Sequence, residues 1–402
     1  MGSGAQHPSS STPTGPGSMR PRGLHPGPPR RRRPGQRGDR HAGRHPVVRG
    51  LVLCVLGLTG VVVGVGIGLP HLVRAGASVA SLLGLLALGG GLGLLVLGAR
   101  TLLRGRRWWV AVVTVAALGA VTGVALLTVG QALAATVVAP SRLADVNPTD
   151  LGPAAREVTA STADGVALSG WYLPSTNGAA VVLRHGAGST RTDVLAQAAV
   201  LGRAGYGVLM LDARGHGASG GRAMDLGWFG DEDVRAGVDL LVTRPEVDPD
   251  RIGVVGLSMG GEEAIGAAAT DPRIRAVVAE GAEQRVAADK AWMADAYGLA
   301  GRVQGVLDRV TYGAVDLLTG ADPPIALRDA VGRAAPRPVL LIAGGAVADE
   351  QRAARWIQAA SPSTVTVWVV PSAGHVQGLA VEPEQWADRV LGFLDENLVA
   401  RQ

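Results

Sequence analysis

Three long apolar stretches follow one another in the first third of the chain, at residues 47–69, 79–99 and 108–139. The second and third contain no charged residue, and the first contains only Arg49, near its start. Each reaches the roughly 18–20 residues that an α-helix needs to cross the hydrocarbon core of a bilayer. The pattern predicts three transmembrane helices, and their many glycines and alanines suit close helix packing in lipid.

The segment before these stretches, residues 1–46, is rich in Pro, Gly, Ser and Arg and has almost no apolar residues. Such a composition cannot bury a core, so we expect a disordered basic tail. Its densest charge is the run of four arginines at residues 30–33. This run either remains solvated or contacts anionic lipid head groups.

After residue 139 the pattern changes to short β-rich runs that alternate with helix-like segments. A linker is expected at residues 140–154, followed by a domain at 155–402. The expected strands are residues 158–162, 166–172, 180–184, 207–211, 252–256, 275–279, 339–343 and 364–370. Helical patterns lie between most of them, so we predict an α/β fold with a doubly wound, mostly parallel sheet.

One connection in this domain, residues 283–335, is longer than a simple crossover needs. It contains apolar and aromatic residues such as Trp292, Tyr297 and Leu317. It forms either a small helical cap over the functional site or an ordinary helix with a long connection.

Charge divides the chain in two. Residues 1–139 hold 15 arginines against one acidic residue, a net charge of +14, whereas residues 140–402 have a net charge of −9. The high isoelectric point therefore describes the N-terminal third alone. The basic residues border apolar segments and are not interleaved with aromatic residues, so the sequence does not predict binding to nucleic acid.

The arginines also predict an orientation in the membrane. They precede the first apolar stretch and lie between the second and third, whereas the loop between the first and second holds only His71 and Arg74. The positive-inside rule places the N-terminus in the cytoplasm. With three spans, the C-terminal domain lies outside the cytoplasm.

The sequence contains no pattern typical of a cofactor or a metal site. The single cysteine, Cys54, lies inside an apolar stretch, which excludes an intrachain disulfide. There is no H-E-x-x-H motif, no phosphate-binding loop and no paired histidine at ligand spacing. We expect neither a metal nor a cofactor.

The pattern that carries most chemistry is Gly256-Leu257-Ser258-Met259-Gly260. It follows an expected strand and precedes an expected helix, which is the context of a nucleophile elbow. Glycines let the two elements pass closely, and the sharp turn directs the serine hydroxyl outward at a helix N-terminus. The alternative is a glycine-rich turn whose serine only caps the helix.

Two further motifs carry a family resemblance. A His-Gly-Ala-Gly run at residues 185–188 follows one expected strand, and D-A-R-G-H-G-A-S at 212–219 follows the next. With the elbow, these motifs resemble the α/β-hydrolase superfamily, near dienelactone hydrolases and prolyl oligopeptidases, over roughly residues 155–399. The resemblance implies an α/β-hydrolase fold in which backbone N–H groups of Met259 and Ala187 form an oxyanion hole.

Triad members follow the order Ser, acid, His in this fold. His375 is the only histidine after Ser258, and it directly follows the last expected strand. The acid is expected after residues 339–343; we favour Asp349, with Glu350 as the alternative, and Asp349 could instead cap the following helix. The acids Glu280 and Glu283 are expected to be solvated loop residues.

Together these features predict a membrane-anchored serine hydrolase, most simply an esterase acting on an ester or thioester. Its expected partner is a small acyl substrate, for which lipid-like compounds are candidates because of the anchor. A serine peptidase and a non-catalytic interaction protein on a hydrolase scaffold are the alternatives. The sequence does not determine the oligomeric state.

Overall fold

The structure is a computed structural model that describes residues 44–399. The arginine run at 30–33 and almost all of the expected disordered tail at 1–46 lie outside the described residues. From Pro46 onward the chain forms one compact unit.

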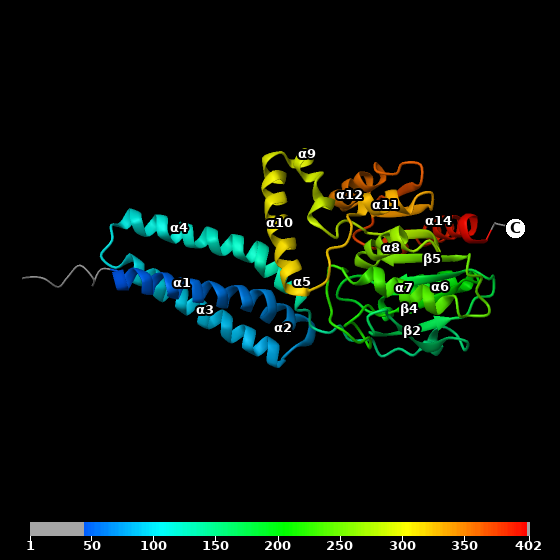
Figure 1. Cartoon of the computed structure of the whole chain (residues 1–402), viewed down its shortest axis with the longest axis horizontal. Helices are drawn as coiled ribbons and strands as arrows, with labels where there is room; N and C mark the ends of the chain where they lie inside the picture. The colour runs from blue at the N-terminus through cyan, green and yellow to red at the C-terminus, as the bar shows by residue number, and fades with distance from the viewer. Residues whose placement is uncertain (1–43, 400–402) are drawn as a thin grey trace, which may run out of the picture. The chain divides into compact units, whose positions relative to one another are not determined.

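Three helices in this part are long and apolar enough to cross a membrane, and they cover Pro46–Ala75, Val79–Leu103 and Trp108–Thr136. The first and third each contain one π-helical turn. Their segments, drawn in blue to cyan in Figure 1, are α1 Arg44–Val63, η1 Gly64–Gly68, α2 Leu69–Ala75, α3 Val79–Leu103, α4 Trp108–Ala125, η2 Leu126–Gly130 and α5 Gln131–Thr136.

Glycines let these helices approach closely. A Cβ atom on Gly84 would lie 2.2 Å from the Cα atom of Gly68, and one on Gly60 would lie 2.6 Å from the carbonyl oxygen of Ala87. No larger residue fits at these crossings without moving a backbone, as expected for helices that pack in lipid.

The third helix ends earlier than the sequence predicts. The apolar stretch continues to Ala139, but Val137 leaves helical geometry at φ −112° and ψ 70°. The guanidinium of Arg222 donates hydrogen bonds of 3.1 and 2.9 Å to the carbonyl oxygen of Thr136. This side chain caps the last turn and stops the helix there.

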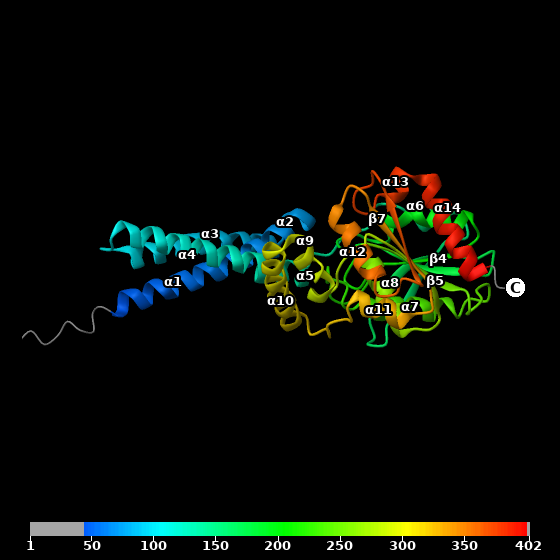
Figure 2. The same ribbon diagram turned by 90° about the horizontal axis from the view of Figure 1, so that it is seen from above.

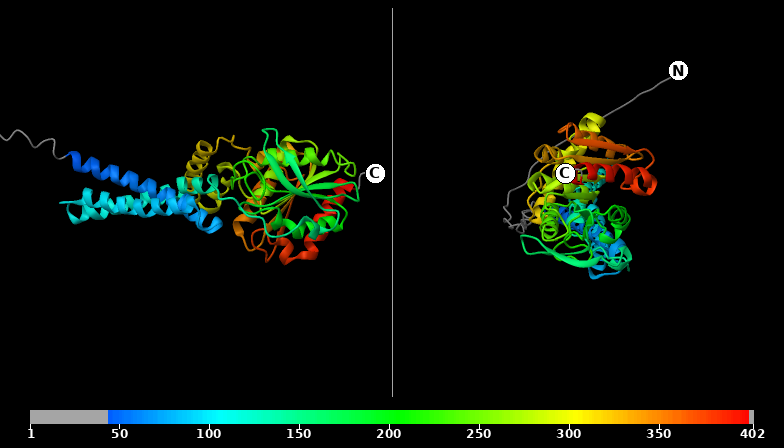
Figure 3. Two further views of the ribbon diagram at one scale, coloured as in Figure 1. Left: turned by 90° about the horizontal axis from the view of Figure 1, so that it is seen from below. Right: turned by 90° about the vertical axis from the view of Figure 1, so that its right-hand side faces the viewer.

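A mixed eight-stranded sheet forms the centre of the C-terminal domain. Its strand order is β1-β2-β4-β3-β5-β6-β7-β8, and every neighbouring pair from β4 onward is parallel. The strands are β1 Arg156–Ser161, β2 Ala167–Leu173, β3 Ala180–Arg184, β4 Gly207–Leu211, β5 Ile252–Leu257, β6 Ile274–Glu280, β7 Val339–Gly344 and β8 Val365–Val370. They cross the domain with a marked twist (Figure 3). The predicted mostly parallel, doubly wound sheet is confirmed.

Helices cover both faces of this sheet (Figure 2). One face packs against α6 Leu195–Arg203 and α14 Pro383–Leu394, through buried residues such as Leu201 and Trp386. The other face packs against α7 Gly230–Leu241, α8 Met259–Thr270, α11 Leu327–Ala334 and α12 Ala348–Gln358. The carboxyl ends of β5, β7 and β8 therefore lie at one edge, where parallel sheets carry their sites.

The remaining elements are η3 Pro148–Leu151, η4 Arg191–Val194, η5 Ala287–Lys290, α9 Met293–Tyr297, the long helix α10 Leu299–Thr319, α13 Gly378–Val381 and η6 Asp395–Val399. The long connection at 283–335 thus contains four elements. Its last helix, α11, packs in the core against α8, whereas α10 contacts α5 and η2.

A buried ionic cluster lies beneath the central strands. The Arg184 guanidinium is fully buried and lies 2.7 Å from the carboxylate of Glu263 and 3.6 Å from that of Asp233. Arg214 lies 2.9 Å from the other carboxylate oxygen of Asp233. A buried guanidinium keeps its charge, so these carboxylates are needed to compensate it.

We predict that Glu263→Ala destabilises the full-length protein by about 3–5 kcal/mol, because Arg184 would remain charged and lose its closest partner. Chemical unfolding of the detergent-solubilised protein measures this change. Glu232→Ala is the matched control, since its ion pair with Arg235 is exposed and contributes about 0–1 kcal/mol at most. Equal losses of stability in the two variants would contradict the prediction.

Candidate functional site

The turn between β5 and α8 holds Ser258 in a strained conformation. Its backbone has φ 53° and ψ −123°, a geometry that residues with a side chain rarely adopt. A Cβ atom on Gly256 would lie 2.1 Å from the carbonyl oxygen of Gly260, so only glycine fits there. The serine N–H donates a 2.7 Å hydrogen bond to the carbonyl oxygen of Glu280, which fixes the turn against β6.

The loop after β8 brings His375 to this serine. The imidazole Nε2 lies 2.9 Å from Ser258 Oγ. On the other side of the ring, Nδ1 lies 2.8 Å from a carboxylate oxygen of Glu350. Ser258 follows β5, His375 follows β8 and Glu350 lies on α12, and their side chains form one continuous chain of hydrogen bonds.

The expectation for the acid needs correction, because Glu350 and not Asp349 contacts His375. Asp349 lies on the outer side of α12, where it pairs with Arg352 at 2.9 Å and accepts a hydrogen bond from the hydroxyl of Tyr297. Neighbouring helical residues point about 100° apart, so only one of the two carboxylates can face the histidine.

Glu350 is held on both of its oxygens. It is almost fully buried, and the oxygen that does not face His375 accepts a 2.7 Å hydrogen bond from the N–H of Gly344, at the end of β7. Glu350 lies in the first turn of α12 and not on the loop that follows β7.

The spacing of residues along α12 distinguishes Glu350 from Asp349. The buried residues of α12 are Glu350, Ala353, Ala354 and Ile357, which recur at the spacing of one helix face. This pattern places position 350 on the buried face and position 349 outside it.

Several carboxylates surround the imidazole. The hydrogen bond that His375 donates to Glu350 is the main cause that raises the pKa of His375 above its ordinary value, and the charges of Glu283 and Glu262 act in the same direction. Burial raises the pKa of Glu262 to about 7 and also raises that of Glu283. This environment favours a protonated imidazole, the form that appears when a serine transfers its proton.

Glu280 is a further residue of the site that the sequence did not assign. It is buried, and not a solvated loop acid as expected. One carboxylate oxygen accepts a 2.7 Å hydrogen bond from the N–H of Gly378, and the other accepts a 2.9 Å bond from the indole of Trp386. Glu280 therefore fixes the segment that follows His375 to the sheet.

The other two histidines of the domain contact backbone groups. His185 is buried, and its Nε2 atom accepts a 2.9 Å hydrogen bond from the N–H of Ala213. Burial keeps its pKa well below the ordinary value, so the ring is neutral. His216 is also buried and lies 3.1 Å from the carbonyl oxygen of Arg214.

A cavity of about 340 Å³ opens beside the serine. Its lining residues come from the turns after β3, β5 and β8 and from the start of α6, and are Gly186, Ala187, Ser189, Asp193, Val194, Gln197, Leu257, Ser258, His375 and Val376. Both loops expected to supply an oxyanion hole meet here, since Ala187 lines the cavity and Met259 is the first residue of α8. An N–H in the first turn of a helix lacks an intrahelical acceptor, which leaves it available to an oxyanion.

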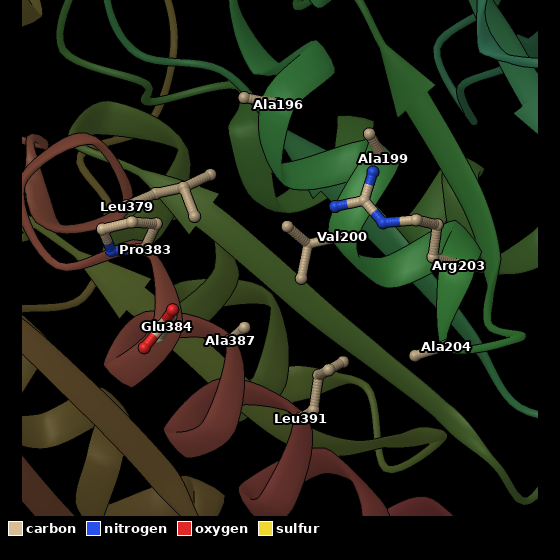
Figure 4. Close-up of a pocket in the computed structure, with 10 residues that line it drawn as sticks. All are labelled: Ala196, Ala199, Val200, Arg203, Ala204, Leu379, Pro383, Glu384, Ala387 and Leu391. Atoms are coloured by element: carbon tan, nitrogen blue, oxygen red, sulfur yellow. The ribbon is translucent and has the colours of Figure 1, made fainter.

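A larger hollow of about 650 Å³ lies between α6 and α14 (Figure 4). Its lining is mostly alanine, valine and leucine, with Arg203 and Glu384 as its charged residues. It shares no lining residue with the cavity at Ser258, and it offers no nucleophile. Among the described residues, no group of histidine, cysteine or acidic side chains is placed to hold a metal ion.

Comparison with known sequences is consistent with this geometry. A family model described as serine aminopeptidase, S33, matches residues 175–314. An uncharacterized protein of Mycobacterium tuberculosis is 37% identical over 123 residues, 30% of this chain and 43% of that protein. A thiohydrolase of Aspergillus aculeatus is 38% identical over 126 residues, 30% of this chain and 40% of that enzyme. The chain thus spans less than half the length of these curated relatives.

Solved structures extend the likeness to the whole C-terminal domain. An esterase of Pyrococcus furiosus is 28% identical and aligns with 64% of this chain and 97% of its own, at a TM-score of 0.51. A protein of Pseudomonas aeruginosa, 23% identical, covers 64% of this chain and 99% of its own at a TM-score of 0.50, a likeness of fold alone. The sheet order, the strained serine turn and these matches together show that the chain belongs to the α/β-hydrolase superfamily.

Proposed function

We propose that this protein is a membrane-anchored serine hydrolase that cleaves an acyl ester or thioester. The single observation that carries the proposal is the chain of hydrogen bonds from Ser258 through His375 to Glu350, at 2.9 and 2.8 Å. A serine needs an adjacent base to become nucleophilic, and the base needs a third group to orient it.

In the proposed reaction, Ser258 Oγ attacks the acyl carbonyl carbon while its proton passes to His375. Glu350 holds the ring and stabilises the imidazolium. The N–H groups of Met259 and Ala187 bind the oxyanion of the tetrahedral intermediate. His375 then protonates the leaving alcohol or thiol, and an acyl-serine remains. Water, deprotonated by His375, releases the acid and restores the serine.

The substrate class rests on the cavity and the relatives. The cavity of about 340 Å³ beside Ser258 suits a small acyl group. The similar Pyrococcus protein is an esterase and the similar Aspergillus protein is a thiohydrolase. We therefore favour esters and thioesters, with lipid-like acyl compounds as candidates because of the anchor.

We further propose that the three apolar helices span the cell membrane, with the N-terminus in the cytoplasm and the hydrolase domain outside it. The arginine distribution supports this orientation. The turn between the first two helices supports the number of crossings, because Arg74, just before that turn, lies 2.5 Å from Asp225 of the hydrolase domain. Three crossings place that turn and the domain on the same side.

A serine peptidase is the second candidate. The family model that matches residues 175–314 is described as an aminopeptidase, and the same three side chains would serve amide cleavage.

For the full-length protein, we expect hydrolysis of short p-nitrophenyl esters and covalent labelling by a fluorophosphonate probe. Ser258→Ala should abolish labelling and lower kcat by on the order of 10⁶-fold, because the acyl-enzyme cannot form. Absence of labelling in a folded wild-type protein would exclude the serine hydrolase. Cleavage of aminoacyl p-nitroanilides in place of the esters would favour the peptidase.

The two neighbouring acids give a matched pair of variants. Glu350→Gln should lower kcat by on the order of 10⁴-fold, since the amide no longer stabilises the imidazolium or its correct tautomer. Asp349→Asn should stay close to the wild-type rate, because its carboxylate faces Tyr297 and Arg352. Steady-state ester hydrolysis measures both, and the reverse order of effects would refute the assignment.

The pH dependence follows from the raised pKa of His375. A general base must be neutral, so kcat/KM should rise with pH through a midpoint above the ordinary histidine value of about 6.5. Any residual activity of Glu350→Gln should show a lower midpoint, because the carboxylate that favours the imidazolium is gone. Asp349→Asn should keep the wild-type midpoint. An unchanged midpoint in Glu350→Gln would contradict the proposed contact.

A further inference from the structure

Helix α10 exposes an apolar stripe. Its exposed hydrophobic residues are Leu299, Val303, Val306, Val310 and Leu317, and their exposed fractions lie between 49% and 88%. They recur at steps of three, four and seven residues, so they share one face of the helix. The opposite face is buried and holds Asp308 and Val315. An exposed stripe of this length usually contacts another apolar surface.

Helix α10 contacts the third apolar helix through the side that does not carry the stripe. Val315 of α10 packs in one cluster with Ala132 of α5, and the Thr311 hydroxyl lies 3.4 Å from the carbonyl oxygen of Leu127. The side chains of Leu127 and Val129 are themselves exposed. The stripe therefore remains uncovered beside a helix that also presents apolar side chains outward.

The contact between α10 and the third apolar helix lies about one bilayer thickness from Trp108, where that helix begins. The segment from Trp108 to Leu127 rises by about 28 Å, which matches a hydrocarbon core of about 30 Å. The exposed pair Trp108 and Trp109 suits one membrane interface. Leu127, and with it α10, then lies at the other interface. Figures 1 and 2 show α10 running across the line of α4.

Charged residues flank the stripe on one side. Arg302 and Arg309 are exposed and lie two turns apart, next to the apolar residues. At a bilayer surface, arginine side chains of this kind reach toward lipid phosphates while their stems stay in apolar surroundings. Apolar and basic residues on adjoining faces are typical of a helix that lies in the membrane interface.

We propose that α10 is an interfacial helix whose stripe dips into the outer leaflet, so that the partner of this surface is a lipid bilayer. This inference rests on the membrane anchoring proposed above. It adds that the hydrolase domain contacts the bilayer through α10, in addition to the attachment by the three apolar helices.

The interfacial helix is also linked to the site. The preceding helix α9 ends at Tyr297, whose hydroxyl binds Asp349, the neighbour of Glu350. A cavity of about 170 Å³ lies where α9 faces α12, and its lining includes Trp292 and Met293 from the first segment and Asp349 from the second. The bilayer contact therefore lies on the helix that directly follows α9, the element that borders the acid side of the triad.

The lone cysteine makes a direct test possible. In a Cys54→Ala background, Val306→Cys, Asp316→Cys and Val113→Cys each carry one fluorescent label, and the full-length proteins are placed in vesicles of phosphatidylcholine and phosphatidylglycerol. Val306 lies on the stripe, Asp316 is exposed on the flank that also carries Arg302 and Arg309, and Val113 lies within the third apolar helix. Spin-labelled lipids and aqueous iodide quench labels in lipid and in water, respectively.

We expect lipid quenching at positions 306 and 113 and iodide quenching at 316. Iodide quenching at 306 with lipid quenching at 113 would overturn the interfacial helix and leave the anchor in place. Iodide quenching at 113 would overturn the anchor itself. Protection of 306 from both quenchers would mean that protein, such as a second copy of the chain, covers the stripe, which also overturns the proposal. A single symmetric peak on size exclusion confirms that each variant is folded.

Discussion

The close passage of β5 and α8 is the constraint on which the site depends. Gly256 and Gly260 leave so little room that the chain must turn sharply at Ser258, and the hydrogen bond from its N–H to Glu280 fixes that turn against the neighbouring strand. The hydroxyl then projects beyond the sheet, where the loops after β3 and β8 reach it. The strain at one residue is offset by the packing of two buried elements.

The ionic cluster behind the turn has a related role. Arg184 ends β3, and its guanidinium binds Glu263 on α8, so the strand that carries the Ala187 loop is tied to the helix that begins at Met259. The two segments expected to bind an oxyanion are thus fixed to one another by a charge pair that water does not reach. Glu280 ties the segment after His375 to β6 in a similar way, because its carboxylate accepts a hydrogen bond from the N–H of Gly378.

Much of the fold could be predicted from local patterns. All eight strands lie close to their predicted positions, because buried parallel strands are short apolar runs between turns. Ser258 and His375, proposed from a motif and from chain order, lie within hydrogen-bonding distance of each other. The carboxylate that contacts His375 could not be chosen in the same way, because the adjacent acids at 349 and 350 differ only in which face of α12 they occupy. The third apolar helix was predicted too long, since Arg222, distant in sequence, caps it at Thr136.

Glu350 stands on a packed helix and not on a mobile loop. Ala354 and Ile357 pack α12 against the sheet, and the N–H of Gly344 donates a hydrogen bond to the Glu350 carboxylate. The backbone that carries this carboxylate therefore shares the stability of a packed helix, which opens far less often than a surface loop moves.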